Sequence, residues 1–441
     1  MIGFRVPIAL GLTCTGLLAA LAPLSLAQRA PAELGPMTYS KDIAPILYKN
    51  CVACHRRGEV APFPLESYQD AAKRARLLAE VAASRYMPPW KPEPGYGDFR
   101  GARRLTDQEI TLLRRWAETG MLRGNDADLP PAPTFAEGWR MGEPDMVLRM
   151  PQPFTVRADG PDVFQTFVLP MNLPKDQYVC GFEFRPGNRR VLHHSVSYLD
   201  NSGIARRLDA ADPAVGYSSF GGPGFTPSGA LGGWSPGASA VRLPDGVAQV
   251  VRKGTDLVIQ NHYHPTGKVE TDQSSIALYF SKTPPRKIAI SVPLLQRNLD
   301  IPPGAKRHRV TASFVTPIDL QVISVTPHMH FLGREMKVTA TLGTGATVPM
   351  IWIRDWDYYW HSQYQYRTPL ALPAGTRIEM EAFFDNSADN PRNPNSPPER
   401  VGWGSETTDE MALCFIQVAV EKSSEAAELR NAVLKQLGFS R

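Results

Sequence analysis

The segment Cys51-Val52-Ala53-Cys54-His55 constrains the fold of this chain more than any other feature. In a C-x-x-C-H motif the two thiols attach to the vinyl groups of a haem, and the adjacent imidazole ligates the iron from one face. A C-x-x-C pair alone is also typical of a redox dithiol or of half a zinc site, or it arises by chance on a surface helix; the histidine favours haem. We therefore predict a covalently bound c-type haem held by Cys51, Cys54 and His55.

The residues around this motif predict a small all-α cytochrome c domain over residues 37–124. Ser40 is a candidate N-cap for the helix that leads into the motif, and a second helical stretch runs from Ser67 to Ser84. Thr106-Asp107-Gln108-Glu109 is a capping box that opens a further helix. Prolines after Met87 break the helical pattern and hold an extended loop. Because methionine is the usual partner of histidine in electron-transfer cytochromes, we predict Met87 as the second haem ligand; the alternative is a buried core methionine.

The N-terminus predicts export. Arg5 precedes an apolar run from Val6 to Leu24, and Ser25-Leu26-Ala27 offers small residues for cleavage. This pattern is typical of a secretory signal peptide over residues 1–27, which takes the chain to the compartment where c-type haem is attached. We therefore expect a periplasmic protein that draws electrons from a periplasmic cytochrome or quinol pathway. No later segment stays apolar over the roughly eighteen residues that a spanning helix needs, so no membrane span is expected.

Charge and cysteine content exclude one class of partner and leave one question open. The net charge of +5 is small for 441 residues and no long basic run is present, so nucleic acid is not an expected partner. Beyond the signal peptide and the haem motif, two of the five cysteines remain, Cys180 and Cys414. An exported chain can oxidise such a pair, but two residues this far apart in sequence do not establish a disulfide.

After a Pro-rich linker over residues 125–139, the pattern of the sequence changes from helical to β. Short apolar or alternating runs are separated by Pro, Gly, Asn and Asp; examples are Phe164–Leu169, Leu257–Tyr263, Ile276–Phe280, Val310–Phe314 and Ile378–Phe384. About 280 residues of this pattern indicate two all-β sandwiches, over residues 140–285 and 286–422. The Gly-rich stretch Gly216–Gly237 is interpreted as a long loop, and residues 423–441 as a terminal helix and tail.

Most of the nine histidines lie in three tight groups within the predicted sandwiches. The groups are His193-His194, His262-Tyr263-His264 and His328-Met329-His330. Residues i and i+2 of a strand point the same way, so His328 and His330 can share a metal. Adjacent histidines diverge, so His193 and His194 need a twisted strand or a bulge to converge. Imidazole suits zinc, copper, iron and nickel, whereas a thioether such as that of Met411 favours copper over zinc. Together the groups predict metal binding rather than structural hydrogen bonding.

In their order along the chain these motifs resemble those of the copper type II ascorbate-dependent monooxygenases. That family includes peptidylglycine α-hydroxylating monooxygenase and dopamine β-monooxygenase. The resemblance covers roughly residues 140 to 420 and rests on five segments: Leu192-His193-His194-Ser195, Trp234-Ser235-Pro236-Gly237, Gln260-Asn261-His262-Tyr263, Pro327-His328-Met329-His330-Phe331-Leu332-Gly333 and Asp409-Glu410-Met411. It implies two jelly-roll sandwiches that face each other across an open cleft, with one copper ion on each.

The resemblance also implies the ligands and the activity. His193, His194 and His262 would hold the first copper ion, and His328, His330 and Met411 the second, where O₂ and substrate meet. Inserting one oxygen atom of O₂ into a C–H bond consumes two electrons, and each copper ion stores one. A soft sulfur ligand favours Cu(I), the state that binds O₂. With the haem motif, this predicts a periplasmic copper-dependent monooxygenase of a small organic substrate, supplied with electrons through the haem and without a need for ascorbate.

The chain also departs from the family. Thr326 stands where the peptide-hydroxylating members have an arginine that grips the substrate carboxylate, and Ala412 and Leu413 follow Met411 where those members have Asn and Tyr. A glycine-extended peptide is therefore not the expected substrate. Two other functions stay open on the sequence alone: a non-catalytic haem- and copper-binding protein that relays electrons or stores metal, and a zinc hydrolase that uses the same histidines.

Overall fold

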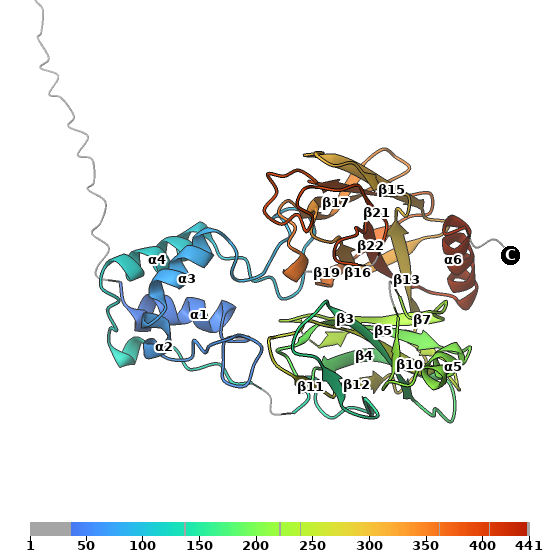
Figure 1. The fold of residues 1–441 in the computed structure, drawn as a ribbon, viewed down its shortest axis with the longest axis horizontal. Helices are drawn as coiled ribbons and strands as arrows, with labels where there is room; N and C mark the ends of the chain where they lie inside the picture. Colours follow the sequence, from blue (N-terminus) through green and yellow to red (C-terminus); the bar gives the residue numbers. More distant parts are fainter. Residues whose placement is uncertain are drawn as a thin grey trace, which may run out of the picture.

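The computed structural model describes residues 37–135, 138–219, 222–238, 240–360, 362–404 and 406–438. The predicted signal peptide, residues 1–27, lies outside the described residues. Figure 1 shows a helical region at one end of the molecule, beside two β-sandwiches stacked on each other. The fold is thus mostly β-sandwich with few helices, as predicted. None of the helices in the described ranges is long and apolar enough to cross a membrane.

Short helices make up the N-terminal region. They are η1 (Tyr39–Ile43), α1 (Ala44–Asn50), α2 (Tyr68–Ala72), α3 (Ala75–Ala83), α4 (Asp107–Glu118) and η2 (Asp126–Asp128). Their apolar faces enclose a core of their own around Leu47, Leu113 and Trp116. The predicted capping box of α4 forms, because the Thr106 hydroxyl accepts from the N–H of Glu109 and the Glu109 carboxylate accepts from that of Thr106.

Two local predictions in this region were wrong. The N-cap is Thr38, whose hydroxyl accepts from the N–H of Lys41, and Ser40 lies inside η1. The single helix expected from Ser67 to Ser84 is divided into α2 and α3. The break falls at Arg74, whose φ of −124° is not helical and whose guanidinium lies 4.2 Å from the centre of the Phe63 ring. Helix propensity does not predict this break, because it accompanies a contact between Arg74 and a residue outside the helix.

The first sandwich consists of two sheets and a short helix. One sheet has the order β6 (Tyr217–Ser218), β3 (Val163–Pro170), β10 (Asp256–Tyr263), β5 (Leu192–Asp200), β7 (Gly229–Trp234). The other has β1 (Met146–Arg149), β12 (Ser275–Phe280), β4 (Gln177–Arg185) and β9 (Val247–Val251), with β8 (Val241–Arg242) paired to β4. β2 (Phe154–Val156) pairs with β11 (Glu270–Asp272), and α5 (Ile204–Ala211) follows β5. The stretch Gly216–Gly237, predicted as a loop, therefore contains the edge strands β6 and β7.

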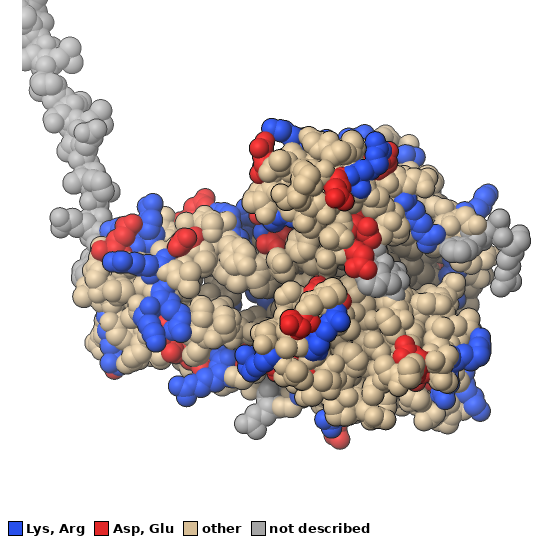
Figure 2. All heavy atoms as spheres, viewed as in Figure 1, with Lys and Arg blue, Asp and Glu red and all other residues tan. Residues whose placement is uncertain are grey.

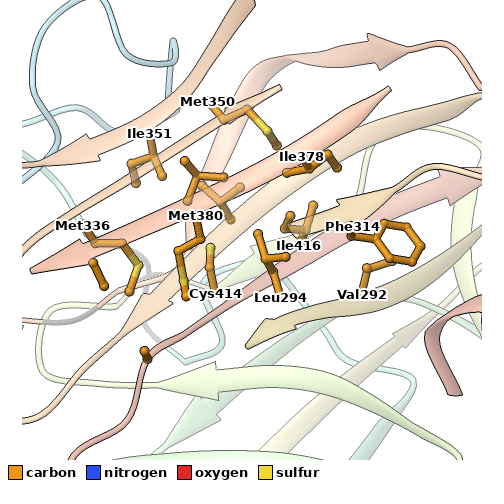
Figure 3. Packing of buried hydrophobic residues seen from close by; sticks show 14 of the residues in the cluster. Val292, Leu294, Phe314, Met336, Met350, Ile351, Ile378, Met380, Cys414 and Ile416 are labelled. Carbon is orange, nitrogen blue, oxygen red and sulfur yellow. The ribbon is translucent and has the colours of Figure 1, made fainter. Parts of the chain in front are cut away.

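The second sandwich has the same two-layer plan. One layer is β13 (Lys287–Leu295), β22 (Leu413–Val420), β16 (Leu320–His328), β19 (Tyr364–Leu372); the other is β15 (His308–Val315), β20 (Arg377–Phe384), β17 (Gly333–Thr341), β18 (Thr347–Ile353). β14 (Asp300–Ile301) pairs with β21 (Val401–Gly402), η3 (Tyr358–Trp360) precedes β19, and α6 (Ser423–Gln436) ends the fold. Met336, Met380 and Ile416 are among the residues that fill the space between its layers (Figure 3).

The two sandwiches share one sheet. β9 of the first pairs in parallel with β13 of the second, with Val247 opposite Lys287, and so joins their sheets into nine strands. A small apolar cluster that includes Val247, Ala289 and Ile323 covers this junction. Cys180 on β4 and Cys414 on β22 are unpaired, so no disulfide links the two sandwiches through them.

The helical region docks on both sandwiches. The segment between α3 and α4 runs along the second: Phe99 is buried in that core, and the N–H of Glu93 donates to the Trp352 carbonyl at 2.8 Å. On the first sandwich, Arg189 donates to the Glu59 carboxylate at 2.8 Å. On the face shown in Figure 2, Lys and Arg are interspersed with Asp and Glu over all three parts.

Candidate metal centres

β5 and β10 bring three of the predicted ligands together. The two strands are antiparallel, and their register shifts: His262 lies opposite His194, but Tyr263 lies opposite Leu192. His193 is therefore the extra residue of a β-bulge, which changes the direction of its side chain. This is the local feature that two adjacent histidines need in order to converge.

The three imidazoles face one another through their Nδ1 atoms. The Nδ1–Nδ1 distances are 3.1 Å for His193 and His262, 3.2 Å for His193 and His194, and 3.3 Å for His194 and His262. A tetrahedral ion with ligands at roughly 2.0 Å keeps neighbouring nitrogens roughly 3.3 Å apart, close to this spacing. Lone pairs at such distances repel unless a cation or protons lie between them. The arrangement fits a metal ion, and we call these three residues the first site.

Asp162 orients one ligand of the first site. Its carboxylate lies 2.6 Å from His262 Nε2 and 2.7 Å from Nδ1 of the exposed His264. Burial opposes ionisation of Asp162, but its hydrogen bonds and charge interactions with His262 and His264 outweigh that effect and lower its pKa. A proton held on His262 Nε2 leaves Nδ1 with the lone pair that a metal needs. The Phe164 ring stacks on His262 with centroids 4.1 Å apart.

His328 and His330 lie together at the end of β16. Their ring centroids are 5.2 Å apart and the rings are nearly perpendicular, at 88°. The i, i+2 prediction had assumed that both histidines lie on a strand. The strand ends at His328, so His330 belongs to the loop that follows. His330 Nδ1 lies 3.0 Å from the Asp409 carbonyl, which leaves its Nε2 as the nitrogen that would bind a metal. Burial lowers the pKa of His330 to about 4, so this ring is neutral at ordinary pH.

The structure brings the backbone of Met411 close to that of His330. β16 and β22 are antiparallel and their last pair is His328 opposite Leu413, so His330 and Met411 lie in the two segments just beyond it. Glu410 Oε2 accepts from the N–H of His330 at 2.8 Å and from that of Met411 at 3.1 Å. The backbone N–H groups of His330 and Met411 therefore donate to the same carboxylate oxygen. We call His328, His330 and Met411 the second site.

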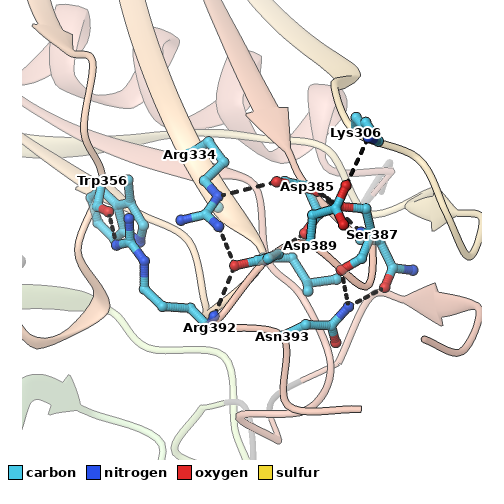
Figure 4. Close-up of polar contacts among 12 residues, drawn as sticks. Lys306, Arg334, Trp356, Asp385, Ser387, Asp389, Arg392 and Asn393 are labelled. Atoms are coloured by element: carbon cyan, nitrogen blue, oxygen red, sulfur yellow. Dashed lines mark hydrogen bonds and ion pairs between the residues drawn. The ribbon is translucent and has the colours of Figure 1, made fainter. Parts of the chain in front are cut away.

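Glu410 and Trp356 hold the loop of the second site. Glu410 is fully buried, and its other oxygen accepts from the N–H groups of Leu332 and Gly333. Burial raises its pKa to about 8, against the backbone donors that favour the carboxylate. Trp356 Nε1 donates to the His330 carbonyl at 3.2 Å, and Arg392 donates to the carbonyl of Trp356 (Figure 4).

The short helix η3 lies between the two sites. The Tyr358 ring stacks on His193 of the first site, with centroids 5.2 Å apart and planes at 26°. The same ring meets His330 of the second site edge-on, at 5.7 Å. Tyr358 is 4% exposed, and burial raises its pKa above the ordinary value. The open cleft that the resemblance implies is thus occupied, between these two histidines, by an aromatic side chain.

The haem motif lies at the end of α1. His55 Nδ1 is 3.0 Å from the Phe63 carbonyl, so its Nε2 is the nitrogen left to ligate iron. Cys51 and Cys54 are not bonded to each other. Burial, with a smaller contribution from Cys54, raises the pKa of the Cys51 thiol to about 12.

A cavity borders Cys54 where the helical region meets the first sandwich. It measures about 210 Å³, and five arginines help to line it: Arg56, Arg103, Arg140, Arg185 and Arg189. Guanidinium groups pair well with carboxylates such as haem propionates, but most of these arginines already have acidic partners. Arg56, Arg140 and Arg189 lie within ion-pair distance of Glu59, and Arg185 within that distance of Glu183. The fit to a haem therefore rests on the donors of the motif, two thiols and an imidazole with a free Nε2. Met87, the predicted second ligand, lines a different and much smaller hollow with Ala82 and Leu105. The structure therefore does not place Met87 in the cavity beside Cys54.

Comparison with known proteins adds no functional information. No family model and no curated protein matches the chain. Among solved structures, the chain is similar to the major capsid protein P2 of bacteriophage PM2, with TM-score 0.25, 10% identity and coverage of 63% of this chain and 98% of that one. It is also similar to PNGF-II (TM-score 0.26, 8% identity, 63% and 65% coverage) and to the VP2 subviral particle of infectious bursal disease virus (0.19, 9%, 68% and 77%). These superpositions are too loose to carry an argument.

Sequence reasoning assigned no role to three residues that shape the sites: Asp162, Glu410 and Tyr358. Asp162 lies 100 residues before the histidine it contacts, so no local pattern connects them. Glu410 precedes Met411 in the motif Asp409-Glu410-Met411, and a carboxylate next to a predicted ligand could have indicated a supporting role. Tyr358 belongs to an aromatic run that suggests core or cleft lining, and only the fold shows which histidines it meets.

Proposed function

We propose that this protein is an exported, copper-dependent monooxygenase that hydroxylates a small organic substrate with O₂. Residues 37–124 would form its c-type haem domain and receive electrons from a periplasmic donor. The observation that carries the proposal is the inward-facing Nδ1 triangle of His193, His194 and His262, together with a separate histidine pair one aromatic ring away. A chain that only stores metal has no need of two unlike sites held so close.

The donor sets suit different tasks. His193, His194 and His262 would hold one copper ion through nitrogen alone, and His328, His330 and Met411 would hold the other with a thioether. When bound, the haem and copper supply single electrons and activate O₂. A thioether disfavours zinc, which argues against a hydrolase at the second site.

The chain's own residues would hold the ligands in one protonation state. Asp162 keeps the proton of His262 on Nε2, and the Asp409 carbonyl keeps that of His330 on Nδ1. Both imidazoles are almost fully buried, at 1% and 3% exposure, so neither bond competes with bulk water. Glu410 fixes the backbone on which the second site stands. These contacts reduce the reorganisation that accompanies each change of metal charge.

The position of the haem motif supports delivery of electrons to the first site. A Cβ atom on Gly237 would lie 3.7 Å from Cys54 Sγ, so the motif contacts the loop that follows β7. Trp234 of β7 lines the cavity beside Cys54 and pairs with Ser195, the neighbour of His194. β7 therefore connects the wall of this cavity to the strand that carries His194.

Metal analysis and a single-turnover assay test the proposal. The haem-loaded protein should bind two copper ions, and His194→Ala should bind one. His264→Ala is the matched control, because His264 shares Asp162 with His262 but is exposed and lies outside the first site. The reduced protein is then exposed to O₂ with a panel of small organic substrates, and products are identified by mass spectrometry with ¹⁸O₂.

The outcomes separate the candidate functions. A hydroxylated product that carries one ¹⁸O atom supports the monooxygenase. Copper binding and haem reoxidation without product, across a broad panel, would favour the alternative of a non-catalytic haem and copper relay. Zinc in place of copper in protein purified from its native compartment would overturn both.

A further inference from the structure

We propose that Tyr358 is the contact through which electrons pass between the first and second sites. The inference rests on the proposed function, because it requires a redox ion at each site. In each transfer the ion at the first site would lose one electron and the ion at the second site would gain it. No bond breaks and no proton moves. Tyr358 is a positioning and coupling residue in this scheme, not a metal ligand.

Ring geometry carries the argument. Tyr358 stacks on His193 at 5.2 Å and meets His330 edge-on at 5.7 Å, so one ring is in contact with a predicted ligand of each ion. The neighbouring Tyr359 meets His193 at 5.8 Å, but its other contacts are with Phe331 and Tyr358.

The surroundings of Tyr358 hold it in place. It is 4% exposed and packs against Phe331 at 4.7 Å, whereas Tyr359 is 53% exposed. A buried ring held on several sides keeps a fixed separation from both imidazoles and excludes water from the space between them. A solvent-filled gap would require solvent to reorganise with each transfer, and a packed ring avoids that cost.

η3 also receives the helical region. Trp360, at the end of the same helix, meets Tyr86 edge-on at 6.1 Å, and Tyr86 precedes Met87 in the loop between α3 and α4. The segment that contacts both histidine sites thus also touches the domain that carries the haem motif. This makes η3 one of the places where all three parts of the molecule meet.

The test follows electrons through the haem- and copper-loaded protein. The haem is photoreduced under anaerobic conditions, samples are freeze-quenched, and the two Cu(II) signals are followed by electron paramagnetic resonance. Tyr358→Phe keeps the ring and should transfer at the unaltered rate. Tyr358→Leu should slow the loss of the second-site signal by at least about tenfold, while reduction of the first site keeps its rate. Tyr359→Leu is the matched control and should change neither step.

Copper content and the starting spectra distinguish the two levels of failure. If the unaltered protein does not bind two copper ions, the proposed function fails. If it does, and Tyr358→Leu transfers electrons to the second site as fast as the unaltered protein, the inference about Tyr358 alone is overturned. Tyr358→Met, which fills the space without a ring, replaces the Leu variant if that variant does not hold both ions, with the same two outcomes.

Discussion

Removing the Asp162 carboxylate should weaken metal binding at the first site without removing a ligand. In the metal-bound state the proton of His262 must stay on Nε2, because Nδ1 is occupied. In Asp162→Ala that N–H would be buried with no acceptor, at a cost of roughly 1 to 3 kcal/mol. The metal-free protein escapes the cost by moving the proton to Nδ1, where it can be shared with His193 or His194. The penalty therefore falls on the metal-bound state.

That range corresponds to a loss of copper affinity of roughly 5- to 150-fold, which overlaps the 10- to 100-fold loss typical of mutated outer-shell partners. Asp162→Asn keeps an oxygen acceptor but no charge and should fall near the lower end. Competition with a copper chelator measures the affinity, and the Cu(II) spectrum identifies the site. His264→Ala should stay within about twofold, because an exposed ion pair contributes little. Unchanged affinity in Asp162→Ala would refute the argument that this carboxylate selects the tautomer.

Three further outcomes are expected. Cys51→Ser combined with Cys54→Ser should abolish covalent haem but leave copper binding intact, as measured by mass spectrometry of the denatured protein and metal analysis; haem that survives denaturation would contradict the motif. Glu410→Gln turns amide hydrogens toward backbone donors and should lower the free energy of unfolding by about 2 kcal/mol, read from urea denaturation. Gly333→Ala would place a Cβ 2.7 Å from that of Met329 and should cost roughly 1 to 3 kcal/mol, read from the melting temperature. An unchanged melting temperature would show that the loop relaxes freely.

Strand positions could be predicted where a short apolar run is bounded by turn residues, the pattern of a strand buried on both faces, as β10 is. The runs Phe164–Leu169 and Leu257–Tyr263 fall within β3 and β10, and the pairing of these strands brings His262 opposite Phe164. β7 was missed for the opposite reason. Its sequence, Gly229 to Trp234, offers too few side chains to alternate, and an edge strand needs only one partner.

The candidate sites divide in the same way. The histidine groups were visible as spacings, and the need for a bulge at His193 followed from the geometry of a strand. Asp162 and Tyr358 depend on contacts between distant segments, which no local pattern encodes. Met87 stays a prediction: a methionine after a helix suits a haem ligand, and its loop packs beside η3 and the second sandwich.

The shared sheet determines how the two sites can work together. Domains joined only by a linker move relative to each other unless their interface is large and apolar. Here β9 and β13 pair directly through Val247 with Lys287 and Ala248 with Ile288, and the apolar cluster around Val247 and Ile323 covers the junction, so a short ladder backed by apolar packing connects the sandwiches. The separation of His193 from His330 is then a property of the fold rather than of a hinge. A contact such as that of Tyr358 is useful only under this condition, since a ring that spans a variable gap would lose one histidine whenever the gap widened.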